Sequence, residues 1–170
     1  LPRASHGVSA GTPIGAASAL HLVAALNDVV AVVRPGDSLL EHALSATGAR
    51  VVVCERADEG MGTSLACGVR ACVDADGWIV ALGDMPWIAP ATIAAVGAAL
   101  HAGAQIVAPA CCGQRGHPVG FAKPYGAALL QLNGDEGARS VVRARQWAVQ
   151  QTEADARGVV GDVDRVEDLR

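Results

Sequence analysis

The sequence is poor in features that define several classes of protein. Lys123 is its single lysine, and the other basic residues are arginines spread along the chain. The formal net charge is −4, whereas a nucleic-acid-binding surface needs clustered Lys and Arg against the phosphate backbone. No apolar run approaches the roughly 20 residues that span a bilayer. Residues 1–11 also lack the apolar core of a signal peptide. Neither nucleic acid nor a membrane is expected as a partner.

The cysteines lack the C-x-x-C spacing of many metal and redox sites, and they lie in or beside apolar runs. They are Cys54, Cys67, Cys72, Cys111 and Cys112. This pattern indicates reduced, mostly buried thiols of a cytoplasmic protein. Cys111, Cys112 and His117 are an alternative zinc set, but adjacent cysteines give poor ligand geometry.

Apolar and charged residues make up 51% and 18% of the 170 residues, which indicates one folded domain with a sizeable core. Helix-like and strand-like segments alternate. Strands are expected at 28–33, 50–54, 78–82, 105–109, 118–122 and 147–153. Helices are expected at 11–26, 38–47, 63–73, 90–103, 124–132 and 136–144.

Strands that are apolar throughout, each followed by a helix, predict an α/β fold whose parallel sheet is covered on both faces. Ligands of such sheets bind at the carboxyl ends of the strands. Asp84 directly follows the apolar strand Trp78–Leu82 and Gly83, and no polar neighbour is available in sequence to pair with it. It is therefore expected at the ligand-binding edge of the sheet.

Asp84 has two interpretations. It either caps the turn toward the next helix or binds a hard cation such as Mg²⁺, which takes one or two carboxylates together with substrate phosphates. Asp162 and Asp164 near the C-terminus are a second supply of acids, and they could equally cap a final helical turn. Convergence of Asp84 with these acids would favour a metal site.

Two glycines precede a Thr-Ser pair in "DEGMGTSLACG", residues 58–68. Gly60 and Gly62 would let the backbone approach a ligand, and Thr63 and Ser64 would offer hydroxyls at a helix N-terminus. An ordinary capped helix is the alternative.

Two further loops carry charged or titratable residues near glycines. In "GQRGHPVG" (113–120), the glycines around His117 suggest a loop held close to a ligand, although a lone His is often structural. In "NGDEGARS" (133–140), Asp135 and Glu136 stand where a helix cap belongs, and Arg139 either lies in the first turn or faces an anionic ligand.

Five stretches, in order and in register, resemble the molybdenum cofactor cytidylyltransferase family of MobA-like nucleotidyltransferases. They are "EGMGTSLACGVRA", "VALGDMPWI", "GQRGHPVGF", "GDEGARS" and "GDVDRVEDL". The resemblance covers residues 13–170 of a single domain. It implies a Rossmann-like, three-layer nucleotidyltransferase fold with a mostly parallel central sheet. It also implies transfer of CMP from CTP to molybdopterin, with release of pyrophosphate and Mg²⁺ as cofactor.

The resemblance also implies roles for individual residues. Asp84 and Asp164 are expected to be the catalytic, Mg²⁺-binding acids, the latter where relatives carry "DIDTPEDL". The nucleotide is expected to contact Gly60, Gly62, Thr63, Ser64 and Gly83. Of these, Ser64 corresponds to the position near the cytosine. The part of the site that binds molybdopterin is expected to be lined by Gly116, His117, Pro118, Asp135 and Arg139.

The sequence departs from the family at its start. Relatives begin with a strand and a loop of the type "LAAGxSxRMGxxK", which holds the triphosphate, whereas residues 11–26 correspond to the helix that follows this loop. Either residues precede Leu1, or the chain is a shortened relative without catalysis. The first is favoured, because loss of a central strand would leave backbone groups unpaired on both sides.

Two other functions remain open. A non-catalytic protein could bind the cofactor or a nucleotide and deliver it to a molybdoenzyme or its chaperone. A sister nucleotidyltransferase could use GTP or another acceptor, because fold and metal site do not fix the substrate.

Overall fold

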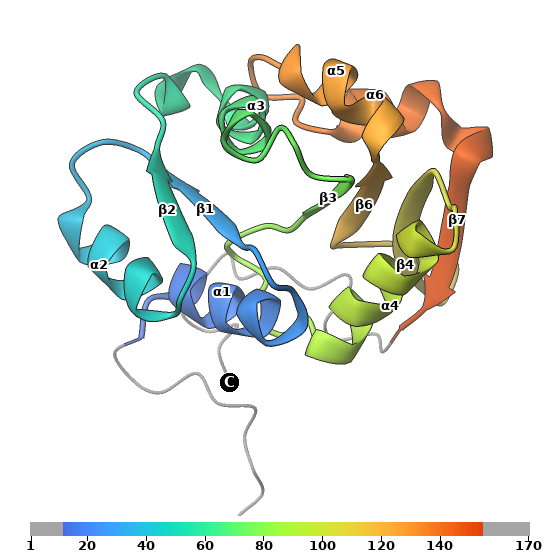
Figure 1. Ribbon diagram of the computed structural model, residues 1–170, viewed down its shortest axis with the longest axis horizontal. Helices are drawn as coiled ribbons and strands as arrows, with labels where there is room; N and C mark the ends of the chain where they lie inside the picture. The colour runs from blue at the N-terminus through green and yellow to red at the C-terminus, as the bar shows by residue number, and fades with distance from the viewer. Residues whose placement is uncertain (1–11, 155–170) are drawn as a thin grey trace, which may run out of the picture.

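The computed structural model describes residues 12–154, which form an α/β fold (Figure 1). The helices are α1 (Ile14–Ala25), α2 (Ser38–Ala46), α3 (Met61–Ala71), α4 (Pro90–His101), α5 (Gly126–Leu130) and α6 (Arg139–Ala144). The strands are β1 (Val30–Val33), β2 (Arg50–Val53), β3 (Gly77–Val80), β4 (Ile106–Cys111), β5 (Gln114–Arg115), β6 (Val119–Ala122) and β7 (Val149–Glu153). Short 3₁₀ turns are η1 (Ala57–Glu59), η2 (Lys123–Tyr125) and η3 (Gln146–Ala148).

Local sequence signals explain where two helices begin. The side chain of Asp37 accepts a hydrogen bond from the backbone N–H of Leu40 at 3.0 Å, which caps α2. Gly48 follows the end of the same helix. Its φ of +93° is a backbone conformation that disfavours residues with a side chain. Pro90 is the first residue of α4, a position where its missing N–H costs nothing.

Two helix starts differ from the sequence expectation. Helix α3 begins at Met61 rather than at Thr63 or Ser64, and its N-cap is Gly60, with no side-chain hydrogen bond. Helix α6 has Ala138 as its N-cap and no side-chain cap, so the capping expected of Asp135 and Glu136 is wrong. A glycine with positive φ (+125° at Gly60) turns the chain into α3 without a hydroxyl or carboxylate cap.

Strands β1 and β2 form a parallel two-stranded ladder, in which Val30 lies opposite Arg50. The other strands form a five-stranded sheet in the order β3-β6-β4-β5, with β7 on β4. Strands β3 and β4 both run antiparallel to β6, so they share a direction, and β7 is parallel to β4. The Rossmann-like, mostly parallel arrangement is thus confirmed. Its reversed strands in residues 12–154 are β6 and the two-residue β5.

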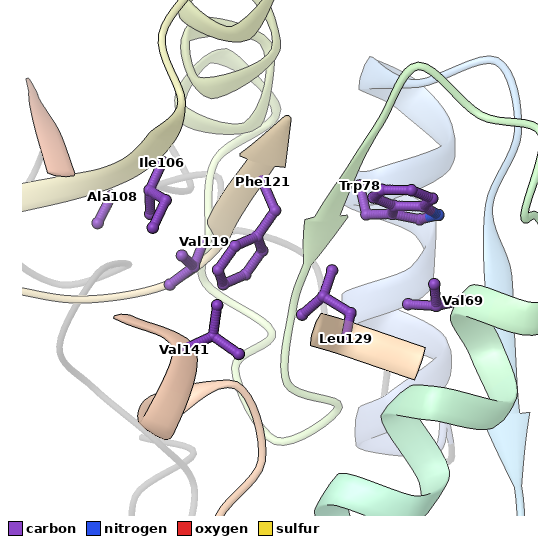
Figure 2. Close-up of a cluster of buried hydrophobic side chains, with 8 residues drawn as sticks. All are labelled: Val69, Trp78, Ile106, Ala108, Val119, Phe121, Leu129 and Val141. Atoms are coloured by element: carbon purple, nitrogen blue, oxygen red, sulfur yellow. The ribbon is translucent and has the colours of Figure 1, made fainter. Parts of the chain in front are cut away.

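Helices cover both faces of the strands (Figure 1). Helices α3, α5 and α6 lie on one face, and α1, α2 and α4 lie on the other. The larger core, between the five-stranded sheet and the first group of helices, is built around Phe121 and Leu129, both 0% exposed (Figure 2). Burial of such side chains contributes about 1.5–3 kcal/mol each.

The cysteines are free thiols, as expected, but the expectation that most of them are buried is wrong. Cys54 is buried, Cys112 is exposed, and the other three are intermediate. Burial raises the pKa of Cys67 and of Cys72 above the ordinary thiol value. Within the part of the chain that the structure describes, no helix has the length and apolar character needed to cross a bilayer.

Candidate functional site

Asp84 lies on the turn that follows the carboxyl end of β3, as the sequence predicts. Gly83 and Asp84 are exposed, whereas the next two residues, Met85 and Pro86, are buried. Met85 belongs to a small apolar cluster with Ile88 and others, which anchors the turn. The carboxylate of Asp84 makes no hydrogen bond or ion pair with any residue from 12 to 154. It therefore presents both oxygens to solvent or to a ligand.

Helix α1 holds this turn in place. The hydroxyl of Ser18, which is only 6% exposed, donates to the carbonyl oxygen of Gly83 at 2.9 Å and is also 3.3 Å from the carbonyl oxygen of Ile14. A Cβ on Gly83 would lie 4.0 Å from the Cα of Gly15, so the first turn of α1 packs against the turn that carries Asp84. Sequence reasoning gave Ser18 no role. A single Ser in an Ala-rich helix does not indicate that its hydroxyl bonds to a residue 65 positions away in the sequence.

His117 lies near the end of β3, within electrostatic range of Asp84 and Arg139. Its ring hydrogen-bonds to the backbone carbonyl of Val80, and both charged residues act on it electrostatically. Burial lowers the pKa of His117 from its ordinary value, and the positive charge of Arg139 acts in the same direction. The charge of Asp84 and the bond to Val80 act the other way, but burial dominates. His117 is thus held neutral near pH 7.

The Nδ1 atom of His117 is buried and has no hydrogen-bond partner among residues 12–154. The next residue, Pro118, is fully buried, and the peptide bond between the two is cis. Gly116, just before them, is partly buried. The loop therefore fixes the ring between the end of β3 and the start of α6.

Gly60 and Gly62 make close approaches, but to protein backbone. The N–H of Gly62 donates to the carbonyl oxygen of Gly134 at 2.7 Å, and a Cβ on Gly62 would lie 2.7 Å from the carbonyl oxygen of Asn133. A Cβ on Gly60 would clash with Gly134 and with the side chain of Asp135. These glycines thus join the start of α3 to the loop before α6.

Thr63 and Ser64 are adjacent in sequence but face different cavities. Ser64 lines the large groove that also contains Gly83 and Asp84. Thr63 is 9% exposed and lines a separate cavity of about 370 Å³ beside Cys54 and Cys67. Its Oγ1 atom is buried, and no residue of the described chain forms a hydrogen bond with it. Within the described residues, only Ser64 of this pair shares a cavity with Asp84.

The expected site residues are thus not all brought together. Asp84, Gly83, His117 and Arg139 lie around the carboxyl end of β3, with Ser64 on the same groove. Asp135 is exposed on the loop that packs against Gly60. Asp162 and Asp164 lie outside the described residues, so their distance from Asp84 stays a prediction.

A carboxylate with free oxygens at a strand end suits a hard divalent cation, which prefers oxygen ligands. Residues 12–154 contain no group of three or more His, Cys, Asp or Glu side chains placed to hold a metal. The zinc set of Cys111, Cys112 and His117 is therefore not assembled; the two sulfurs lie 3.3 Å apart at a hairpin turn. Asp84 can supply one oxygen ligand from the described chain.

Comparison with known families decides the class of the protein. The family model of the MobA-like NTP transferase domain matches residues 6–152. The chain belongs to this family. It is a nucleotidyltransferase domain, which agrees with a ligand-binding edge built around an exposed carboxylate and an arginine. Among curated proteins, none matches the chain.

Solved structures support the same fold. The manganese complex of Rv0371C from Mycobacterium tuberculosis H37Rv is 26% identical and superposes with a TM-score of 0.77, covering 91% of this chain and 82% of that one. A nucleotidyl transferase from Methanothermobacter thermautotroptrophicus is 23% identical, with a TM-score of 0.69 and coverage of 87% and 73%. A CMP:2-keto-3-deoxy-manno-octonic acid synthetase complexed with CTP is 16% identical, with a TM-score of 0.65 and coverage of 95% and 87%.

Proposed function

We propose that this nucleotidyltransferase transfers CMP from CTP to the terminal phosphate of molybdopterin and releases pyrophosphate. Mg²⁺ is the proposed cofactor, held by Asp84 and Asp164. The observation that carries the proposal is the exposed carboxylate of Asp84, which has no hydrogen bond or ion pair among residues 12–154 and acts electrostatically on His117. Manganese in the structure of a 26% identical relative supports a divalent cation in this fold.

The described side chains suit this chemistry. A bound divalent cation stabilises the negative charge that develops on phosphate oxygens. The guanidinium of Arg139, exposed at the start of α6, attracts a second phosphate group. His117, held neutral, adds no second positive charge beside Arg139. No Ser-His or Cys-His pair is required, because the attacking group is already a phosphate anion.

Ser64 is the proposed contact for the cytosine. It lines the groove that contains Asp84, on the first turns of α3. Its hydroxyl is 3.5 Å from the carbonyl oxygen of Gly60, a weak interaction that a base could replace. A small hydroxyl side chain here also supports the cytidylyl rather than the guanylyl branch of the resemblance.

A nucleotide panel tests the proposal. Pyrophosphate release is measured with CTP, GTP, ATP and UTP, each with Mg²⁺ and with or without molybdopterin. Release that requires both CTP and molybdopterin is the expected result. Release with GTP or with a different phosphorylated acceptor would replace the substrate assignment with that of a sister transferase.

The second candidate is a binding or delivery protein for the cofactor or a nucleotide, passing it to a molybdoenzyme or its chaperone. Calorimetry separates the two. A carrier binds molybdopterin without CTP or Mg²⁺ and releases no pyrophosphate, whereas the transferase turns over.

A further inference from the structure

Two cysteines lie at the tip of the hairpin that joins β4 to β5. Cys111 ends β4 and pairs with Gln114 of β5, so Cys112 and Gly113 form the whole turn. The Sγ atoms of Cys111 and Cys112 are 3.3 Å apart. Cys112 is exposed, and Cys111 is partly exposed. The hairpin therefore presents two thiols in contact with each other and with solvent.

The backbone of the turn explains this contact. The φ of Cys112 is +53°, and that of Gly113 is +80°. Successive side chains of a strand point to opposite faces, so two adjacent cysteines in extended conformation would hold their sulfurs apart. Because Cys112 leaves the strand conformation, its thiol can meet that of Cys111.

Cysteine is an unusual residue at this position. Hairpin turns in which both central residues have positive φ strongly favour Asn, Asp or Gly at the first of them. Of the residues from 12 to 154, Cys112 is the only one other than glycine with a positive φ. A strained backbone conformation at a chemically reactive side chain points to a role for that side chain.

The thiols elsewhere in the chain are less open to a dissolved reagent. Cys54 is buried, and burial raises the pKa of Cys67 and of Cys72. A raised pKa lowers the fraction of thiolate, which is the nucleophilic form. Cys112, by contrast, is exposed. An oxidant in solution is therefore expected to react first at Cys112.

A second thiol within contact distance determines the product. Oxidation of a thiolate gives a sulfenic acid, which condenses with a neighbouring thiol to a disulfide. The Sγ of Cys111, at 3.3 Å, is placed for this second step. The Cα atoms of adjacent residues are about 3.8 Å apart, closer than the roughly 4.4–6.8 Å of ordinary disulfides. Such a bond is strained, so small thiols reduce it readily.

The hairpin is continuous with a loop of the candidate site. Strand β5 leads directly into Gly116 and His117, and the N–H of Gly116 donates to the carbonyl oxygen of Pro109 in β4 at 2.9 Å. A disulfide between Cys111 and Cys112 closes a small ring that contains their peptide bond. The modification would thus restrict the backbone of a turn that lies shortly before His117 in the chain.

We propose that Cys111 and Cys112 are a redox modification site, where hydrogen peroxide converts the two thiols into a disulfide. In the first step the sulfur of Cys112 attacks peroxide, the O–O bond breaks, and a sulfenic acid and one water form. In the second step the sulfur of Cys111 attacks the sulfenic sulfur, the S–O bond breaks, and the hydroxide leaves as water with the thiol proton. Two electrons pass from the thiols to peroxide. Glutathione restores both thiols by exchange and is itself oxidised to its disulfide.

Mass spectrometry of the whole chain tests the proposal. Chain 1–170 is treated with hydrogen peroxide, and samples taken over time are alkylated under denaturing conditions before their masses are measured. We expect the chain to lose two hydrogen atoms while Cys111 and Cys112 escape alkylation, and fragmentation should place the new bond between them. Addition of glutathione should make both residues available to alkylation again.

Two variants complete the test. Cys112→Gly removes one thiol at a position where the positive φ suits glycine, so the fold is retained. This variant should lose two hydrogen atoms at least 10-fold more slowly than the unsubstituted chain. Cys72→Ser is the matched control, because it also removes one thiol and its hydroxyl can replace the sulfur that lies 3.2 Å from the carbonyl oxygen of Gly68. Its oxidation rate should stay within twofold of the unsubstituted chain.

Several outcomes would contradict the proposal. A disulfide between other cysteines, or between two chains, would show that it is wrong. The same holds for oxidation that only adds oxygen atoms, and for a Cys112→Gly variant that loses two hydrogen atoms as fast as the unsubstituted chain. A disulfide between Cys111 and Cys112 that forms with peroxide and opens with glutathione supports it. These are mass measurements, so their outcome is independent of the proposed function.

Discussion

The hydroxyl of Ser18 donates to the carbonyl oxygen of Gly83 at 2.9 Å, so helix α1 holds the turn that presents Asp84. Ser18→Ala removes this bond and leaves the carbonyl without its partner. We expect a loss of about 1 kcal/mol in the free energy of unfolding, measured by urea denaturation.

Ser45→Ala is the matched control. Ser45 is exposed on α2, and no side-chain hydrogen bond of it occurs within the described chain, so stability should change by less than about 0.5 kcal/mol. An equal effect of the two substitutions would mean that the bond to Gly83 does not anchor the turn.

Glycine at position 62 is required by close packing rather than by an unusual φ. Gly62→Ala places a Cβ 2.7 Å from the carbonyl oxygen of Asn133 and should destabilise the protein by about 1–3 kcal/mol. In α4, a Cβ on Gly97 meets only the Cδ1 atom of Ile79, at 3.6 Å. Gly97→Ala should therefore be neutral or stabilising, by up to about 1 kcal/mol. Thermal unfolding of the two variants measures the difference, and a tolerated Gly62→Ala would contradict the close contact.

Stability should depend on pH through His117. Its pKa is lowered in the folded state by burial, so below about pH 6.5 the unfolded chain binds more protons than the folded one. The contribution of His117 to the free energy of unfolding is fully present above that pH. It is lost as the pH falls toward the lowered pKa of His117 in the folded state. Urea denaturation between pH 8 and 5 measures it. His117→Gln should flatten the slope in this range, and an unchanged slope would exclude His117 as its source.

Arg139 is expected to bind a phosphate group of a substrate. Arg139→Gln should raise the KM for nucleotide or acceptor at least 10-fold, because a charge-assisted hydrogen bond is lost. Arg143→Gln, one turn further along α6 and also exposed, is the matched control and should leave KM within twofold. Steady-state kinetics of both variants decide the point. Equal KM values for the two variants would show that Arg139 does not bind a substrate phosphate.

Patterns within single segments predicted much of this fold. Continuous apolar strands gave the α/β class, Pro90 marked the start of α4, and "GDMP" placed Asp84 at the end of β3. Each feature is local, because a short run of residues determines it.

Features that depend on contacts between distant segments were not predictable in the same way. The glycines of "EGMG" suggested a ligand, but in the structure they approach the loop of Asn133 and Gly134. The separation of Thr63 from Ser64 into different cavities depends on which side of α3 each residue occupies. The role of Ser18 depends on a partner 65 residues away.

The most direct measurement is Mn²⁺ binding in the presence of CTP, followed by electron paramagnetic resonance, for Asp84→Asn and for the matched control Asp74→Asn. Asp74 is an exposed acid in the loop between α3 and β3. If Asp84 holds the divalent cation, Asp84→Asn weakens Mn²⁺ binding at least 10-fold and abolishes most pyrophosphate release, while Asp74→Asn changes neither. Unchanged Mn²⁺ affinity together with full turnover in Asp84→Asn would contradict the account.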